Sequence, residues 1–196
     1  MGSEMCIRDS TADALCPAGL YNDNIEDGLI RYVSSPKGLL DASSPFECIA
    51  QQTNCVSCVG FGFAGDVATA FSYGDPYASR SSDLRRKNTA LTNSCSVPGT
   101  NVILECPDHD DSRWQPKIVN MMAQWNPGKP LACVRRFPPN NQRDDTCDRI
   151  RWFKSCLTEI SRDTTITSIA FPDRIGCGLA GESWLTYKRC LEEFAR

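Results

Sequence analysis

Apolar and polar positions along the chain divide it into strands and helices that follow one another in turn. Runs of β-type residues, each followed by turn-forming residues, occur at 28–33, 46–56, 101–106, 117–125 and 165–171. Apolar residues recur at helical spacing at 64–71, at 144–160 and from about Ser183 onward. Because strands alternate with helices, the sequence predicts an α/β fold of three layers, α/β/α, around a mixed, largely parallel sheet.

The segments outside this pattern lie mainly at the N-terminus. The first ten residues, MGSEMCIRDS, show no periodicity and resemble a translated sequencing adaptor or cloning scar. Residues 11–27 mix turn formers with isolated apolar residues. We therefore expect residues 1–27 to form an irregular leader and residues 28–196 to form one domain. The interval 72–100 is expected to hold a short helix and a surface loop.

Composition agrees with a single folded domain. The chain has 196 residues, of which 41% are hydrophobic and 23% charged, and its net charge is -3. This charge provides no basic field for a polynucleotide, although arginine can still bind a small anion. No apolar stretch approaches the roughly 20 residues that span a bilayer. We expect a monomer that binds neither membrane nor polynucleotide.

The twelve cysteines favour free thiols over disulfides. Cys48, Cys156 and Cys190 lie inside apolar runs, and no signal-peptide stretch precedes the domain, so we expect a reducing, cytoplasmic location. Cys55 and Cys58 form a lone C-x-x-C, which lacks the second pair of a structural zinc site. Cysteine packing is the favoured interpretation, with a redox role as the alternative, and no metal or cofactor is expected.

An acidic loop and the single histidine add little chemistry. Asp108, Asp110 and Asp111 surround His109, the only histidine of the chain. Acidic residues in a loop between strands are usually solvated, so a metal site is the less favoured interpretation. A triad that needs histidine would depend on this loop, which makes such catalysis improbable.

Two glycine-rich loops carry the clearest sign of a site, at 60–66 and 175–183. Each follows a predicted strand and precedes a predicted helix. Glycine lets the backbone approach an anion closely, and a helix N-terminus adds partial positive charge. Parallel strands would bring both loops to one edge of the sheet, where they can hold one diphosphate between them. Neither loop has the Lys-Ser or Lys-Thr of a nucleoside-triphosphatase loop. The alternative to an anion site is that the glycines of both loops only make tight turns.

The residues of these loops resemble macro domains. Residues 168–184, SIAFPDRIGCGLAGESW, are similar to the closing strand, phosphate loop and last helix of that family. Residues 51–55, QQTNC, followed by the glycine loop at 60–65, resemble its ribose-binding Asn strand and first loop. The similarity is closest to the branch with ADP-ribose 1″-phosphate phosphatases and ADP-ribosyl-glutamate hydrolases. It implies a macro-domain fold that binds ADP-ribose, or a derivative such as an ADP-ribosylated macromolecule, and hydrolyses it as a phosphatase or de-ADP-ribosylating enzyme.

The same resemblance implies which residues bind the ligand. Asn54 would meet the distal ribose, the first loop would line that ribose and a phosphate, and the second loop would wrap the diphosphate. The expected ligand-binding residues are Gly38, Leu39, Asn54, Gly60, Gly62, Phe63, Ala64, Gly65, Ile175, Gly176, Cys177, Gly178, Leu179, Ala180 and Gly181. Within the second loop, neighbouring backbone N–H groups could lower the pKa of Cys177, although a small side chain that merely fits is the simpler interpretation.

Catalysis is less well defined than binding. Asn54 and Asp66 are the candidate catalytic residues. The alternative interpretations are a turn residue for Asn54 and a partner of the helix dipole for Asp66. Two positions depart from the family: Gly38 replaces the Asp that holds adenine, and Ala180 replaces the Asp of the glutamate-linked hydrolases. Hydrolysis would then depend on Asn54 and a water between the loops. A non-catalytic reader of ADP-ribose and a domain that has lost its ligand remain the alternatives.

Overall fold

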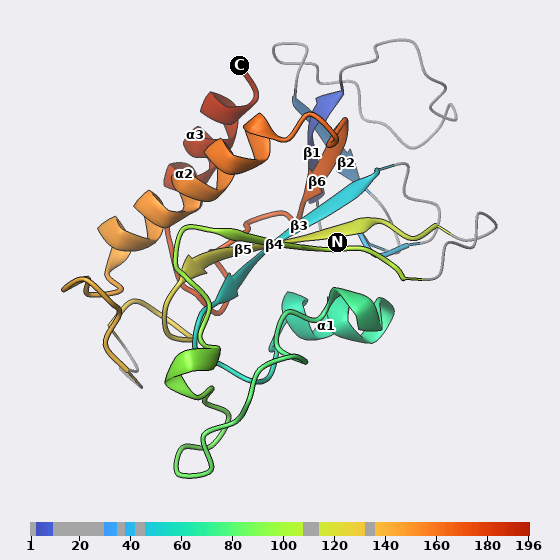
Figure 1. Ribbon diagram of the computed structural model, residues 1–196. Helices are drawn as coiled ribbons and strands as arrows, with labels where there is room; N and C mark the ends of the chain where they lie inside the picture. The colour runs from blue at the N-terminus through green and yellow to red at the C-terminus, as the bar shows by residue number, and fades with distance from the viewer. Residues whose placement is uncertain (1–2, 10–29, 35–37, 42–45, 108–113, 132–135) are drawn as a thin grey trace.

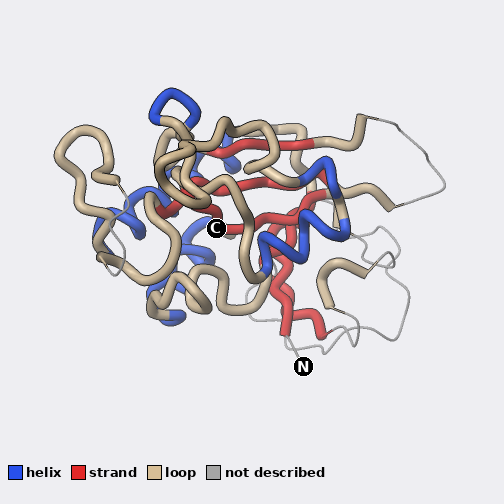
Figure 2. The backbone as a smooth tube through the Cα atoms, turned by 90° about the horizontal axis from the view of Figure 1, so that it is seen from below, coloured by secondary structure: helices blue, strands red, loops and turns tan. Residues whose placement is uncertain are grey.

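The computed structural model describes residues 3–9, 30–34, 38–41, 46–107, 114–131 and 136–196. Figures 1 and 2 show the strands of this part of the chain side by side in one sheet. The strands are β1 (Ser3–Asp9), β2 (Ile30–Ser34), β3 (Cys48–Asn54), β4 (Asn101–Leu104), β5 (Lys117–Gln124) and β6 (Ser168–Phe171). The helices are α1 (Phe63–Ala70), α2 (Thr146–Arg162) and α3 (Trp184–Phe194), with 3-10 turns at Ser72–Gly74 and Thr92–Ser94.

The strand order in the sheet is β2-β1-β6-β3-β5-β4. β3 pairs in parallel with both of its neighbours, β5 and β6. β4 pairs antiparallel with β5, and β1 pairs antiparallel with both β6 and β2. The predicted α/β class with a mixed sheet is confirmed, but parallel pairing is confined to the three central strands of the described sheet. The carboxyl ends of β3, β5 and β6 consequently share one edge.

β1 differs from the expectation for the N-terminus. Residues Ser3–Asp9 fall in the segment predicted to be irregular, yet they form a strand between β2 and β6, with Met5 opposite Phe171. The backbone of an edge strand offers unpaired N–H and C=O groups, so a neighbouring segment can pair with it without hydrophobic periodicity of its own. The other residues of the predicted leader, 1–2 and 10–27, lie outside the described residues.

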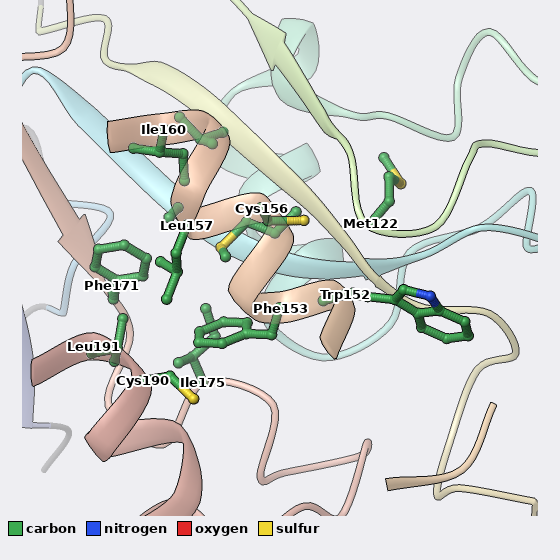
Figure 3. Packing of buried hydrophobic residues seen from close by; sticks show 14 of the residues in the cluster. Met122, Trp152, Phe153, Cys156, Leu157, Ile160, Phe171, Ile175, Cys190 and Leu191 are labelled. Carbon is green, nitrogen blue, oxygen red and sulfur yellow. The ribbon is translucent and has the colours of Figure 1, made fainter. Parts of the chain in front are cut away.

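α2 forms as its sequence predicts. Its N-cap is Asp145, whose carboxylate accepts the backbone N–H of Asp148 at 2.9 Å. The predicted apolar stripe includes Phe153, Leu157 and Ile160, and all three side chains are buried. They pack with residues of β6 and α3 in one core cluster (Figure 3).

Helices cover both faces of the sheet (Figure 1). Cys48 and Ala50 of β3 belong to the core cluster that α2 and α3 share, whereas Ile49 belongs to a second cluster with Val67 of α1. Alternate residues of a strand point to opposite faces, so the two clusters lie on opposite sides of β3. In the described part of the chain, none of the helices is both long enough and apolar enough to cross a membrane.

Candidate functional site

A cleft of about 310 Å³ lies at the carboxyl edge of the three parallel strands. Its walls are the ends of β3 and β5, residues 61–64 of the first glycine loop, residues 172–179 around the second loop, and Tyr77. Sites for small molecules begin at about this volume and extend to roughly 1,000 Å³. The parallel arrangement thus brings the two glycine loops, which are more than 100 residues apart in sequence, to one cavity.

The structure brings part of the predicted ligand-binding set together here. The predicted residues that line the cleft are Asn54, Gly62, Phe63, Ala64, Ile175, Gly176, Gly178 and Leu179. The predicted residues that do not line it are Gly38, Leu39, Gly60, Gly65, Cys177, Ala180 and Gly181. Both loops therefore contribute residues to the cleft, although Cys177, between Gly176 and Gly178, does not line it.

Gly38 and Leu39 do not line the cleft, and both have evident structural roles. Leu39 is only 3% exposed and packs in the core cluster with Phe46 and Ile49. Gly38 has a φ of 86°, and its carbonyl accepts the N–H of Asp41 at 3.3 Å in a turn. The short segment 38–41 thus closes the core on the α1 side of the sheet.

Asp66 lies outside the cleft as well. It is exposed in the first turn of α1, the only acidic residue there. A carboxylate in this position interacts favourably with the helix dipole, which was the alternative interpretation of this residue. Its position offers no support for a catalytic role.

Asn54 ends β3 with all of its polar groups oriented by neighbours. Its Oδ1 accepts the backbone N–H groups of Val56 and Ser57 at 3.2 and 2.7 Å, which is the geometry of an Asx turn. Its Nδ2 and its backbone N–H both donate to the hydroxyl of Tyr77 at 3.2 Å. Asn54 therefore shapes the turn and also lines the cleft. One Nδ2 hydrogen remains for a ligand.

Tyr77 and Arg80 were not predicted, because they come from the interval 72–100 that has no hydrophobic period. Burial raises the pKa of Tyr77 to about 12, so its phenol is protonated at neutral pH. Arg80 is buried, lies 4.7 Å from the Tyr77 ring centre, and donates to the carbonyls of Asn54 and Ser57 at 3.0 and 2.7 Å. In the sequence, only the presence of a Tyr and an Arg in a polar loop pointed to these contacts with the end of β3.

Two glutamines at strand ends also line the cleft. Gln52 of β3 donates from Nε2 to Oε1 of Gln124, the last residue of β5, at 3.0 Å. Gln52 Oε1 and the Tyr187 hydroxyl are both buried, and neither has a hydrogen-bond partner among the described residues. Both strands end in polar residues, and this feature of β5 could have identified Gln124 from sequence.

The first glycine loop presents the N-terminus of α1 to the cleft. Gly62 is the N-cap residue, with a φ of 59° and no side chain to accept the first amides. Within the described residues, no acceptor takes the N–H of Phe63 or Ala64. These amides and the helix dipole together favour an anion at this wall.

The second glycine loop adds further amides from the opposite wall. In the described part of the protein, the N–H groups of Gly176, Gly178 and Leu179 have no acceptor, whereas that of Glu182 donates to the Gly176 carbonyl at 3.2 Å. The loops approach closely, because Leu179 Cδ1 lies 3.1 Å from where a Cβ on Gly62 would be. An anion between the loops would meet N–H groups from both sides.

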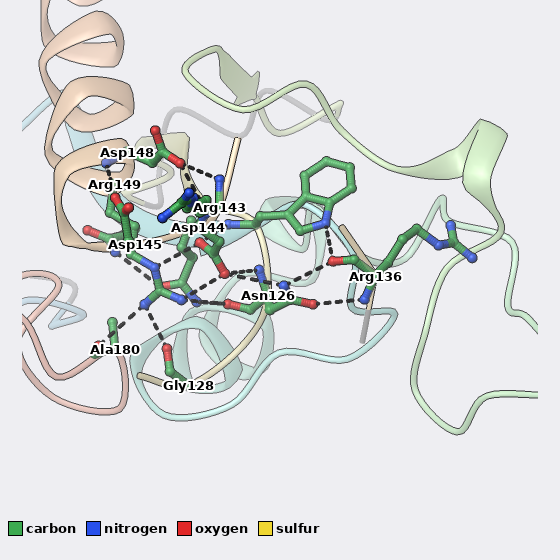
Figure 4. Close-up of polar contacts among 12 residues, drawn as sticks. Asn126, Gly128, Arg136, Arg143, Asp144, Asp145, Asp148, Arg149 and Ala180 are labelled. Atoms are coloured by element: carbon green, nitrogen blue, oxygen red, sulfur yellow. Dashed lines mark hydrogen bonds and ion pairs between the residues drawn. The ribbon is translucent and has the colours of Figure 1, made fainter. Parts of the chain in front are cut away.

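A buried ion pair fastens the second loop to its surroundings (Figure 4). Arg149 of α2 is fully buried and donates to both carboxylate oxygens of Asp144, at 2.9 and 3.0 Å. The same guanidinium donates to the carbonyls of Gly128 at 2.7 Å and Ala180 at 3.4 Å. Asp144 in turn accepts the backbone N–H of Trp125 at 2.9 Å. The pair thus connects α2, the segment after β5 and the second glycine loop.

Two titratable groups beside the second loop are held in their protonated forms more strongly than usual. Burial raises the pKa of Cys177 to about 11, so its thiol is protonated at neutral pH and donates to the Ile175 carbonyl at 3.4 Å. The suggested lowering of the Cys177 pKa is therefore wrong, because desolvation exceeds any effect of the loop amides. Burial also raises the pKa of Glu182, opposed by the nearby Arg149 guanidinium.

No metal site is present among the described residues, where no group of three His, Cys, Asp or Glu side chains could hold an ion. The acidic loop with His109 lies outside these residues. Cys55 and Cys58, like the other seven cysteines whose side chains are described, are free thiols. Burial raises the pKa of Cys55 well above its usual value, which suits packing better than redox chemistry.

The cleft itself holds one pair of opposite charges, Asp173 and Arg174. They lie between β6 and the second glycine loop, after Pro172, and neither was predicted as a site residue.

No model of a known protein family matches the chain, and neither does any curated protein or solved structure.

Proposed function

We propose that this protein is a macro-type domain whose cleft binds ADP-ribose, free or within a derivative, with the diphosphate between the two glycine loops. The proposal rests on the unpaired N–H groups that the loops present from opposite walls, at Phe63 and Ala64 and at Gly178 and Leu179. Backbone amides and a helix N-terminus are the groups that bind phosphate oxygens in proteins. The helices on both faces of a mixed sheet agree with the three-layer architecture expected of this fold.

The strongest support for the proposal comes from the surroundings of Gly178. A Cβ added there would meet no atom within 4 Å, and its φ lies outside the left-handed region. Neither backbone conformation nor packing therefore requires glycine at this position. Because Gly178 lines the cleft, the space that its missing side chain leaves is available to a ligand.

Asn54 and Tyr77 suit the ribose. Asn54 Oδ1 already accepts the N–H groups of Val56 and Ser57. The side chain can therefore only donate to the ligand, although an amide without these contacts could both donate and accept. The Tyr77 hydroxyl accepts two N–H groups from Asn54, which leaves its own hydrogen to donate to the ligand. Ribose oxygens accept such hydrogen bonds.

Hydrolysis of the bound derivative is the second part of the proposal, and a reader without activity is its alternative. Among the described residues that line the cleft, none is Lys or His, so a mechanism through a catalytic lysine has no support there. Asp173 is the one carboxylate among these lining residues. Whether Asp173 takes part in hydrolysis therefore distinguishes an enzyme from a reader.

Isothermal titration calorimetry with ADP-ribose tests the binding proposal. We expect saturable heat at one site per chain for the native protein and none for Gly178→Glu, whose side chain would fill the space between the loops with negative charge. Thermal unfolding of the variant serves as the control for folding. Absence of heat with the native protein, or equal binding by the variant, would remove the site assignment and leave a domain that has lost the ligand.

A further inference from the structure

Arg80 is a buried cation that no carboxylate neutralises among the described residues. It is only 9% exposed, and its guanidinium donates to uncharged acceptors alone. Nη1 donates to the carbonyls of Asn54 and Ser57 at 3.0 and 2.7 Å, and Nη2 donates to the Ser96 hydroxyl at 2.7 Å. Arginine cannot lose its proton in a protein, so this charge is permanent. A buried charge is costly unless an opposite charge pairs with it, which raises the question of what Arg80 serves.

The acidic residues of the interval 72–100 are engaged with other groups. Asp75 Oδ1 accepts the backbone N–H of Tyr77 at 2.8 Å. Asp83 Oδ2 lies 3.6 Å from Arg136 Nη2, and Asp83 Oδ1 accepts the backbone N–H of Arg85 at 2.9 Å. The positive charge of Arg80 is therefore not cancelled from within its own segment.

This charge lies directly behind two residues of the cleft wall. Arg80 Cζ is 4.7 Å from the centre of the Tyr77 ring, and Arg80 Nη1 binds the carbonyl of Asn54. Asn54 and Tyr77 both line the cleft. The charged residues among the described lining are Asp173 and Arg174, whose charges cancel. The lining itself is thus neutral, and Arg80 adds a positive charge behind it.

We propose that Arg80 is a positioning residue that makes the cleft selective for an anionic ligand, because its unpaired charge acts on the diphosphate through Asn54 and Tyr77. This inference rests on the proposed function and deepens it, since it names the source of charge selectivity in a neutral cleft. Arg80 is shielded from water, so solvent screens its charge less than that of an exposed cation such as Arg85. The guanidinium over the ring also polarises the Tyr77 phenol, which makes its hydroxyl a better donor to an anion.

Ser96→Asp tests the role of the charge with Arg80 in place. Ser96 is partly exposed and already accepts from Arg80 Nη2, so an aspartate there can pair with the guanidinium and cancel its charge. This variant should unfold at the native temperature or above, yet raise the Kd for ADP-ribose by about 10-fold in calorimetry. Ser96→Asn is the matched control, because it has nearly the same shape without the charge, and its Kd should stay within about threefold of the native value. A purely structural role of Arg80 predicts native affinity for both variants.

Arg80→Lys and Arg80→Gln separate charge from hydrogen bonding. Lysine keeps the charge and loses the fork of donors, whereas glutamine keeps an N–H donor and loses the charge. The Kd for ADP-ribose should stay within about threefold of the native value in Arg80→Lys and rise by about 10-fold or more in Arg80→Gln. Inorganic pyrophosphate, which lacks both riboses and the base, should show the same order of affinities. Thermal unfolding identifies any variant that fails to fold, and the two Ser96 variants then decide.

Three results have distinct meanings. Native affinity in Ser96→Asp would overturn the inference and leave the proposed function intact. Equal loss of affinity in folded Arg80→Lys and Arg80→Gln would do the same, because hydrogen-bond geometry and not charge would then explain the effect. Absence of ADP-ribose binding by the native protein would overturn the proposed function, and this inference with it.

Discussion

The Asn54 side-chain amide donates to the Tyr77 hydroxyl at 3.2 Å, and this hydrogen bond joins the end of β3 to a loop that sequence patterns leave undefined. Both residues are buried and both line the cleft. The geometry of the candidate ribose subsite therefore depends on a contact between segments 23 residues apart.

Tyr77→Phe tests this contact. Loss of the hydroxyl leaves the buried N–H and Nδ2 of Asn54 without their acceptor, which costs about 1 to 3 kcal/mol of unfolding free energy. ADP-ribose affinity should fall by about 10-fold or more, because the donor to the ligand is lost as well. Urea denaturation and calorimetry measure the two effects. Unchanged affinity together with lower stability would limit Tyr77 to a structural role.

Asn54→Asp separates the turn from the ligand contact. The aspartate oxygen can still accept the N–H groups of Val56 and Ser57, so the turn should survive. The Nδ2 donor is replaced by negative charge near the proposed diphosphate, and binding should be lost. Asn54→Ala should instead lose the turn and unfold more easily by about 1 to 3 kcal/mol. Binding by Asn54→Asp at native affinity would place the ligand elsewhere.

Two glycines of the second loop should respond differently to alanine. Gly178→Ala meets no neighbour and should change the unfolding free energy by less than about 0.5 kcal/mol, while it weakens ligand binding. Gly176 has a φ of 74°, and its Cβ would lie 2.5 Å from Gln52 Oε1 and 2.7 Å from the Tyr187 ring. Gly176→Ala should therefore cost about 2 kcal/mol or more. Equal stability of the two variants would contradict the loop conformation described.

The Arg149–Asp144 pair should stabilise the protein far more than an exposed pair does. Arg149→Met leaves the Asp144 carboxylate buried without its cation, and we expect a loss of about 3 to 5 kcal/mol in urea denaturation. Arg151→Met is the matched control, since its side chain is 58% exposed in its pair with Asp148, and it should cost about 1 kcal/mol or less. Similar losses from both variants would show that the buried pair does not hold the loops.

Glu182 should make the folded protein less stable as the pH increases. Burial raises its pKa in the folded protein above the ordinary value of 4.5. The folded protein then holds this proton to higher pH than the unfolded chain, so the Glu182 contribution to stability falls as pH increases past about 4.5. Glu182→Gln, which stays neutral, should be more stable than the native protein at pH 7, and the difference should shrink toward pH 4. A difference that grows on acidification would reverse the assignment.

Cys177 should behave as an unreactive thiol although it lies in a loop of free amides. With its pKa raised to about 11, it carries almost no thiolate at pH 7, and only the thiolate reacts with iodoacetamide. Mass spectrometry should find slow alkylation of Cys177 in the folded protein and fast alkylation in urea. Cys177→Ser should bind ADP-ribose within about twofold of the native affinity. Rapid alkylation of the folded protein at pH 7 would contradict this account.

Local patterns were sufficient for some of these features. The N-cap Asp145 and the apolar stripe of α2 depend on residues within a few turns of one helix, so sequence spacing predicts them. Each glycine loop follows a strand that the sequence predicts, and parallel pairing of β3 and β6 brings the two loops together.

Other features depend on contacts that no local pattern encodes. Tyr77 and Arg80 reach Asn54 through the path of a loop without hydrophobic period. Leu39 was assigned to the ligand, but its burial depends on β3 and α1 lying over it. Asp66 was considered for catalysis because it follows the glycine loop, yet the helical turn directs it to solvent.

The central claim, that both glycine loops bind one diphosphate, is tested most directly by amide chemical shifts during titration with ADP-ribose. The N–H resonances of Phe63 and Ala64 in the first loop should move together with those of Gly178 and Leu179 in the second, with one common dissociation constant. Shifts in only one loop, or in neither while the ligand binds, would contradict the proposed site.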